Sequence, residues 1–290
     1  MSTLPTEPST TERPVGLERY VHEPHRVGLP PLMPYVRSLW QRREFAMELA
    51  RTKLRAQHFN TAFGQFWLLL NPVLLGMVYF LLVDILRHGR HSPHAFAHLL
   101  GCLFAFQFVQ DSVRQGSKSV VTGGKLILNT AFPRVLLPIS SVIQGFMRFL
   151  PTMVIFAVVH TVSGLPVNLN LLWVIPLVAL FTLQATGVAT LVGVGQVYFR
   201  DLSSFLPYLL RVWMYISPVL YYASEVPQRY KFLLEINPVA PLLTAWSRVL
   251  IFGQAPPAHD LLLGLAWAVA LVLVGGLFFM SREREFAVRL

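Results

Sequence analysis

Charged residues are scarce in this chain. Asp, Glu, Lys and Arg make up 13% of its 290 residues, against about 25% in typical soluble domains. None of them occurs in the 51 residues from Phe149 to Phe199. A helix needs about 20 apolar residues to cross a bilayer, so this run has room for two crossings, with a reversal at Gly164–Asn170. The pattern predicts an integral membrane protein and excludes a soluble globular one.

Other absences each exclude a structure or a mechanism. The single cysteine, Cys102, allows no internal disulfide. No internal repeat supports an inverted-repeat transporter, and no pair of intramembrane carboxylates supports proton-coupled transport. Gly123-Gly124-Lys125 resembles the end of a phosphate-binding loop, but Leu126 follows where that loop needs Ser or Thr. Hydrolysis of ATP by this chain is therefore not expected.

The apolar segments predict an all-α integral membrane fold with six transmembrane helices. Residues 1–34 are polar and Pro-rich, without the apolar region of a signal peptide, and are expected to form a flexible cytoplasmic tail. The segment Leu242–Phe252 is interrupted by Arg248 and suits a short re-entrant or interfacial helix before the last span. The six spans are placed at about 62–85, 95–112, 137–162, 171–199, 203–222 and 261–280.

An amphipathic helix is predicted over residues 38–59, ahead of the first span. Its apolar side contains Leu54 with Trp40 at the margin, and Arg51 and Arg55 lie opposite. Such a helix before a first span is expected to lie in the membrane interface, in contact with membrane lipids. An ordinary solvated helix is the alternative.

The distribution of Lys and Arg predicts the orientation of the chain. Seventeen of them fall in the N-terminal segment, in the loops after the second and fourth spans and in the C-terminal tail, against five on the opposite side. Cytoplasmic loops carry the excess of positive charge. Both termini are therefore expected in the cytoplasm. The net charge of +10 has this topological explanation, and no nucleic acid partner is expected.

Two arginines, Arg148 and Arg211, fall inside predicted spans. Either each side chain extends to the interface, as long cationic side chains do, or it faces a pore or an anionic headgroup. No acidic residue is expected at matching depth, which argues against a lipid-facing position. Tyr215 falls near the face of Arg211, and aromatic residues such as Trp67 and Tyr79 are suited to stacking on sugar rings. These five residues form the predicted substrate channel.

Four histidines, His88, His91, His94 and His98, recur at short spacings that could serve zinc. Pro93 interrupts the helix that would align them. A hydrated histidine-rich loop is the favoured interpretation, and no metal site is expected.

Four segments in order resemble the membrane-spanning subunits of ABC-2 type exporters, in the branch that exports polysaccharide, O-antigen or teichoic acid. The resemblance covers about residues 38–290 and makes 35–290 an ABC-2 type transmembrane domain. The segments are Phe63–Pro72, Gly124–Pro138, Phe199–Leu202 followed by Ser217–Tyr221, and Asn237-Pro238 followed by Arg248.

The resemblance implies a homodimer in the cytoplasmic (inner) membrane, with two copies of a separate ABC ATPase subunit. ATP and Mg would bind to that partner, so this chain is expected to hold no cofactor and to have no catalytic residue. The substrate would be a lipid-linked glycan of the O-antigen, teichoic-acid or cell-wall galactan type. The ATPase-coupling loop would contain Lys125, Leu126, Asn129, Phe132, Pro133 and Arg134, and the second cytoplasmic loop would contain Arg200 and Asp201.

Two other functions remain open from the sequence. One is a drug or antibiotic exporter of the same superfamily. The other is a membrane-embedded glycosyltransferase or a flippase without an ATPase. The longest predicted outward loop, Ala223–Asp260, offers the transferase only the widely spaced Glu225, Glu235 and Asp260.

Overall fold

The computed structural model describes residues 31–57, 66–86 and 94–289, and the regular structure in these ranges is entirely helical. Residues 1–30 of the predicted tail, and residues 62–65 of the first predicted span, lie outside the described residues. The helices are α1 Leu32–Gln41, α2 Arg43–Gln57, α3 Trp67–Leu86, α4 Ala95–Thr122, α5 Gly124–Asn129, α6 Leu136–Val162, η2 Leu169–Trp173, α7 Val174–Tyr198, α8 Leu202–Ile216, η3 Ala223–Glu225, η4 Gln228–Tyr230, α9 Lys231–Ile236, α10 Ala240–Phe252, α11 Ala258–Arg282, η5 Glu283–Glu285 and α12 Phe286–Arg289.

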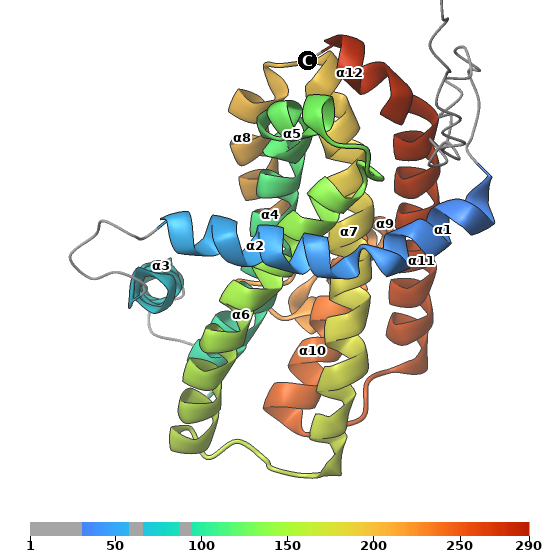
Figure 1. Ribbon diagram of the computed structural model, residues 1–290. Coiled ribbons are helices and arrows are strands. Elements are labelled where there is room, and N and C mark those ends of the chain that lie inside the picture. Colours follow the sequence, from blue (N-terminus) through green and yellow to red (C-terminus); the bar gives the residue numbers. More distant parts are fainter. Residues whose placement is uncertain (1–30, 58–65, 87–93, 290) are drawn as a thin grey trace, which may run out of the picture.

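Four helices of the described part are long and apolar enough to cross a membrane, namely α4, α6, η2 with α7, and α11 with its C-terminal extension. They run up the picture in Figure 1, whereas α3 is viewed nearly along its axis. The apolar parts of α3 and α10 are shorter. The structure is therefore that of an all-α membrane protein, and six crossings remain a prediction.

Two predicted spans end at clearly different residues in the structure. The second, predicted to end at Ser112, continues to Thr122 because Arg114 and Lys118 face a polar pocket, which a hydropathy pattern alone does not reveal. The fifth, predicted to reach Tyr222, ends at Ile216. Pro218 disfavours helical backbone at the residue before it, and Ser217 accordingly has an extended conformation.

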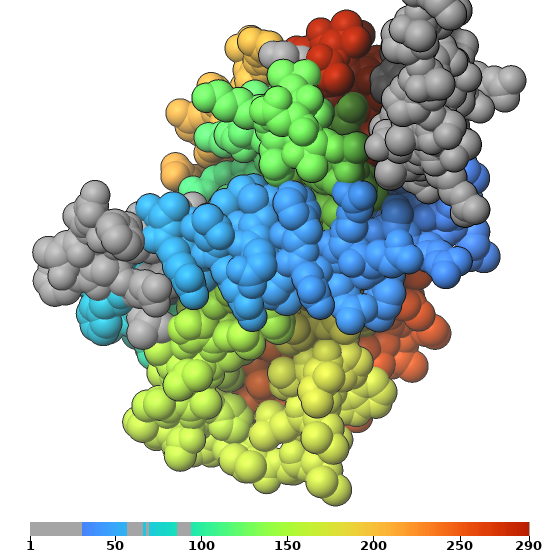
Figure 2. Space-filling view, viewed as in Figure 1, coloured from blue at the N-terminus to red at the C-terminus, as the bar shows by residue number. Residues whose placement is uncertain are grey.

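The predicted interfacial helix is divided between α1 and α2, which join at Arg42. Figure 2 shows the two as a band across one face, with the segment that contains α5 above it and the ends of α6 and α7 below it. Ala46 and Ala50 are fully buried on the apolar side of α2, and Leu54 is half-buried there. Arg51 and Arg55 are exposed, and Trp40 is exposed beneath the guanidinium of Arg43.

The short helix predicted at Leu242–Phe252 is α10, and most of its side chains are buried. The Trp246 Nε1 atom donates a hydrogen bond to the Gly101 carbonyl of α4 over 3.1 Å. The last residue of α10 is followed by Gly253, which adopts a left-handed conformation with φ of 61°. Glycine is favoured in this conformation. The Asn168 and Asn170 side chains both donate to the Gly253 carbonyl, over 2.6 and 2.7 Å. The loop between α6 and α7 thus fixes the end of α10.

Helices α7 and α11 approach closely because glycines stand at their contact. A Cβ atom on Gly187 would lie 2.4 Å from the Leu271 carbonyl carbon, and one on Gly275 would lie 2.4 Å from the Gly187 carbonyl oxygen. Small residues permit such backbone contact between membrane helices. The neighbouring Gly276 would meet nothing within 4 Å.

This contrast gives a matched pair of substitutions. Gly275→Ala should destabilise the protein by about 1–3 kcal/mol because the new methyl group must push two backbones apart. Gly276→Ala should be neutral or stabilising, since alanine favours a helix over glycine by about 1 kcal/mol. Thermal unfolding of the two variants in detergent measures the difference. Equal melting temperatures would contradict the close contact of α7 and α11.

Candidate functional site

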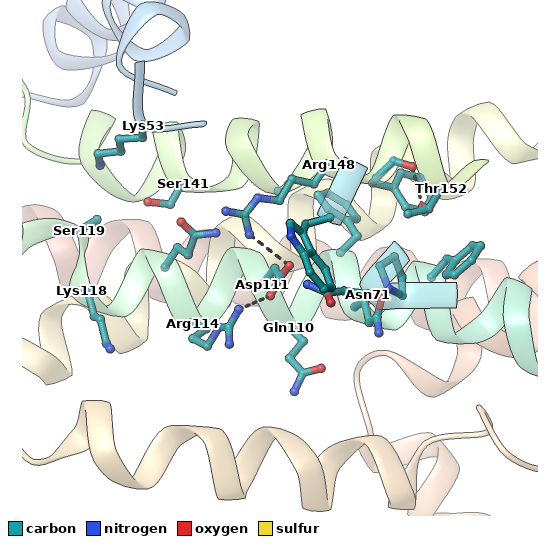
Figure 3. Close-up of a pocket in the computed structure, with 18 of the residues that line it drawn as sticks. Lys53, Asn71, Gln110, Asp111, Arg114, Lys118, Ser119, Ser141, Arg148 and Thr152 are labelled. Atoms are coloured by element: carbon teal, nitrogen blue, oxygen red, sulfur yellow. Dashed lines mark hydrogen bonds and ion pairs between the residues drawn. The ribbon is translucent and has the colours of Figure 1, made fainter. Parts of the chain in front are cut away.

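A cavity of about 1030 Å³ lies among α2, α3, α4 and α6. Figure 3 shows Arg148 of α6 extending towards Asp111 and Arg114 of α4, with Lys53 of α2 nearby. Neutral polar side chains surround these charged groups: Asn71, Gln107, Gln110, Gln115, Ser119, Thr122, Ser141 and Thr152. We refer to this cavity as the cationic pocket.

Among the described residues, four cations and one carboxylate line the cationic pocket, which gives this lining a formal charge of four minus one, or +3. The cations are Lys53, Arg114, Lys118 and Arg148, and the carboxylate is Asp111. Burial lowers the pKa of the Lys53 ammonium group, because a low-dielectric surrounding disfavours the charged form. An anion entering the pocket would oppose that effect.

The structure corrects the expectation that Arg148 has no acidic partner. Its Nη1 atom lies 3.5 Å from Asp111 Oδ2, and Arg114 Nη2 lies 2.8 Å from Asp111 Oδ1. The sequence placed Asp111 at the end of a span, whereas it lies within α4, beside α6. Asp111 is shared between two guanidinium groups, so it does not neutralise both. The Arg148 side chain is 15% exposed, and its buried Nε atom has no hydrogen-bond partner.

Aromatic side chains form an apolar flank of the same pocket. Phe108 and Phe149 are stacked with ring centroids 5.3 Å apart, and Phe104 and Trp67 also line the cavity. Trp67 and Arg148, both predicted channel residues, are therefore brought together here. A pocket with a cationic part and an adjoining apolar part suits an amphiphile with an anionic headgroup.

The other three predicted channel residues lie elsewhere. Arg211 and Tyr215 are exposed on α8, which buries Leu206, Leu210 and Met214 on another side. The Tyr215 ring lies 6.5 Å from that of Tyr79 on α3 in an edge-on arrangement. None of the three lines the cationic pocket. The predicted channel set thus divides into two groups.

The predicted coupling loop lies at one end of the bundle, where α5 is packed beside α12 (Figure 1). We refer to η5 and α12, residues 283–289, as the C-terminal segment. The Arg134 backbone N–H donates to Glu283 Oε1 over 2.8 Å, and its guanidinium donates to the Glu283 carbonyl. The Tyr35 hydroxyl of α1 donates to Glu283 Oε2 over 2.5 Å. Glu283 therefore joins α1, the coupling loop and the C-terminal segment.

Further contacts attach the coupling loop to α2. The Phe132 ring lies 5.2 Å from the Phe45 ring, and Arg42 Nη1 donates to the Ala131 carbonyl over 2.5 Å. Burial and the adjacent Glu283 carboxylate raise the pKa of the Tyr35 hydroxyl, so it remains a donor at neutral pH. Burial lowers the pKa of Arg134, which the Glu283 carboxylate opposes.

The remaining residues of the predicted loop differ in exposure. Lys125 and Asn129 are exposed, Leu126 is half-buried and Pro133 is buried. A cavity of about 600 Å³ opens between this loop and the C-terminal segment. The exposed residues are therefore the part of the loop that is available to another protein.

The second predicted cytoplasmic loop lies at the same end of the bundle. Arg200 Nη2 donates to the Arg289 carbonyl over 3.4 Å, and the Gln196 side chain donates to the Arg200 carbonyl over 2.6 Å. Asp201 is exposed where α8 begins. Because α12 also contacts α5 and α7, the C-terminal segment bridges the two loops.

The expected hydrated histidine loop is wrong for His98. That side chain is 4% exposed and lies within α4, where Nδ1 is 2.7 Å from Ser247 Oγ and Nε2 is 3.2 Å from the Tyr221 carbonyl. His88 and His91 lie outside the described residues. Within the described ranges no cluster of three metal-ligating side chains occurs.

Two segments that carried the family resemblance meet in the structure. Asn237 Nδ2 donates to Ser217 Oγ over 2.9 Å, and Asn237 Oδ1 accepts from Trp213 Nε1 over 2.8 Å. The sequence assigned Trp213 no such role. An Asn-Pro pair and a Ser-Pro pair in apolar surroundings are the signal that identifies this contact, since a buried amide needs partners.

Comparison with known proteins agrees with this architecture. No protein-family model matches the chain. It is 25% and 26% identical over 235 residues to two O-antigen export system permease proteins RfbA of Klebsiella pneumoniae, covering 81% of this chain and 90% of each relative. It is 28% identical over 255 residues to the RfbA permease of Myxococcus xanthus, covering 87% of this chain and 97% of that protein. These similarities cover most of each chain, and together with the four helices that are long and apolar enough to cross a membrane they support a multi-pass membrane protein similar to O-antigen export permeases.

Proposed function

We propose that this protein is the membrane-spanning subunit of an ABC exporter that moves a lipid-linked polysaccharide across the inner membrane. The polysaccharide would be of the O-antigen type, as the names of the relatives indicate. The observation that carries the proposal is the cationic pocket with its aromatic flank. A lipid-linked glycan has a phosphate-bearing head between a hydrocarbon chain and sugars. The cations of this pocket suit the phosphate, and its aromatic flank suits the hydrocarbon chain.

The position of the pocket supports the same conclusion. Lys53 and Ala56 of α2 belong to its lining. If α2 lies in the membrane interface, as its amphipathic pattern predicts, the pocket lies at the depth of lipid headgroups. A phosphate group then reaches the cations without leaving the headgroup region.

The subunit would work as a homodimer of six-span chains with two copies of an ATPase subunit, which would bind ATP and Mg. The coupling loop is the proposed contact with the ATPase, since its exposed residues stand on a base fixed by Glu283 and Phe45. The contact of Tyr35 near the beginning of the chain with Glu283 near its end supports termini on one side of the membrane. The bias of Lys and Arg favours the cytoplasmic side.

Deletion of the gene tests this function against the two alternatives. We expect loss of surface polysaccharide with accumulation of the lipid-linked polymer inside the cell. A glycosyltransferase would instead leave no lipid-linked polymer, and a drug exporter would change drug susceptibility with normal surface polysaccharide. Immunoblots of the polysaccharide from intact and lysed cells distinguish the three outcomes. The purified subunit should hydrolyse no ATP until it is combined with the ATPase.

A further inference from the structure

A second cleft, of about 530 Å³, lies on the α10 side of the bundle, away from α5 (Figure 1). It is formed by α9, α10, the beginning of α11 and the segment that follows α8. We refer to it as the α10 cleft. Its lining includes two aromatic rings, Tyr222 and Phe252, and the buried polar side chains of His98 and Ser247. Its volume falls within the range of about 300–1,000 Å³ that is usual for ligand sites.

The charge of the α10 cleft is balanced, in contrast to that of the cationic pocket. Lys231 and Arg248 contribute two positive charges, and Glu235 and Asp260 contribute two negative charges. A phosphate group would meet repulsion from two carboxylates here and has a better site in the cationic pocket. A balanced set of donors and acceptors suits an uncharged ligand with many hydroxyl groups.

The aromatic wall of the cleft is held in place from behind. The Tyr222 ring lies 4.0 Å from the His98 ring and 5.9 Å from the Phe252 ring. His98 is itself fixed by Ser247 and by the Tyr221 carbonyl. Phe252 is 49% exposed, so its ring is available to a ligand. Aromatic rings pack against the apolar faces of other rings and keep their polar edges free.

Polar side chains are arranged around that wall. Arg248 Nη1 donates to Gln254 Oε1 over 3.2 Å, and His259 Nδ1 lies 3.4 Å from Asp260 Oδ1. Guanidinium, amide and carboxylate groups have donors and acceptors in fixed planes that match neighbouring hydroxyl groups. Rings for the faces of a sugar and planar polar groups for its hydroxyls are thus found in one cleft.

We infer that the α10 cleft binds uncharged sugar residues of the exported polysaccharide. The inference rests on the proposed export function and adds a second site, separate from the cationic pocket, that binds glycan. The phosphate-bearing end of the substrate and its sugars would then be recognised by different parts of the bundle. Phe252 contacts the sugar face, and Asp260 accepts hydrogen bonds from its hydroxyls.

Binding to the full-length protein in lipid nanodiscs tests this inference. The probe is the surface polysaccharide of the source organism, released from its lipid by mild acid and shortened to oligosaccharides. Saturation-transfer NMR should detect contact with wild-type protein. Phe252→Ala and Asp260→Asn should each weaken binding by about tenfold, through lost ring contact and lost hydrogen bonding. Phe232→Ala is the matched control, because Phe232 is 53% exposed on α9 and does not line the cleft.

A second probe, an isoprenyl diphosphate, separates the two sites. Phe252→Ala should bind it as wild-type protein does, and Arg148→Gln should bind it weakly while retaining the oligosaccharide. Oligosaccharide binding that is absent from wild-type protein, or unchanged in both cleft variants, would overturn the inference. Export of the polysaccharide by cells with wild-type protein is measured in parallel. Normal export without oligosaccharide binding would refute only the sugar site in the α10 cleft, whereas absent export would refute the proposed function.

Discussion

Replacement of Arg148 by glutamine is expected to reduce polysaccharide export by about tenfold or more, because a largely buried cation attracts an anion more strongly than an exposed one. The substitution lowers the formal charge of the cationic pocket from +3 to +2 and leaves Asp111 with Arg114 as its partner. Folding should be retained, since the new amide still offers a donor to Asp111. Surface polysaccharide measured by flow cytometry, with equal protein in the membrane fraction, gives the result.

Two companion variants identify the cause. Arg148→Lys should retain part of the export, because the charge remains and the planar guanidinium is lost. Asp111→Asn should strengthen the binding of an isoprenyl diphosphate, because it removes the one carboxylate among the described residues that line the pocket. Arg229→Gln serves as the control, since Arg229 is exposed and outside the pocket. Wild-type export by Arg148→Gln would mean that this pocket is not on the substrate path.

Exchange of Phe132 and Arg134 together for alanine should lower the ATP hydrolysis that accompanies export by about tenfold or more. Transmission of a conformational change requires a contiguous packed element, and the double substitution removes two side-chain attachments of the loop. Arg134 loses its guanidinium contact with the Glu283 carbonyl, and Phe132 leaves the Phe45 ring. Hydrolysis by the reconstituted complex, with and without lipid-linked substrate, measures the coupling.

Phe45→Ala separates two explanations for that loss. If Phe132 acts through its packing on α2, Phe45→Ala should reproduce much of the effect. If Phe132 contacts the ATPase directly, the reconstituted complex with Phe45→Ala should hydrolyse ATP as the wild-type complex does, and copurification of the ATPase with the double variant should fall. Normal coupling in the double variant would place the contact elsewhere, with the loop at Arg200 and Asp201 as the next candidate.

The apolar pattern predicted a helix well where the local sequence sets the ends of that helix. The third predicted span, 137–162, differs from α6 by one residue, and the last, 261–280, lies within α11. The pattern failed where a helix continues past its apolar part. In α4, Arg114 and Lys118 end the hydropathy signal although the backbone remains helical to Thr122. Both residues line a cavity whose other walls are α2, α3 and α6, and no local pattern contains that information.

The sequence predicted that a cationic and aromatic site exists, but it identified only some of the residues that form it. Residue type identified Arg148, because an arginine within an apolar span costs free energy and is usually retained for a function. Its pairing with Asp111 joins residues that are 37 positions apart and depends on how α4 packs against α6. His98 was misassigned for the same reason, since its partners belong to α10 and to the segment after α8.

The contacts of Glu283 and its neighbours have a practical consequence for protein engineering. Phe286 is fully buried against Phe279, Tyr198 donates a hydrogen bond to Glu285 over 2.6 Å, and the Arg289 guanidinium lies over the Tyr198 ring. A reporter enzyme fused in place of residues after Arg282 would therefore release α1 and the coupling loop along with the removed segment. Fusions for topology mapping should retain residues 283–289 and add a spacer, and affinity tags should be tested for lost export before structural work begins.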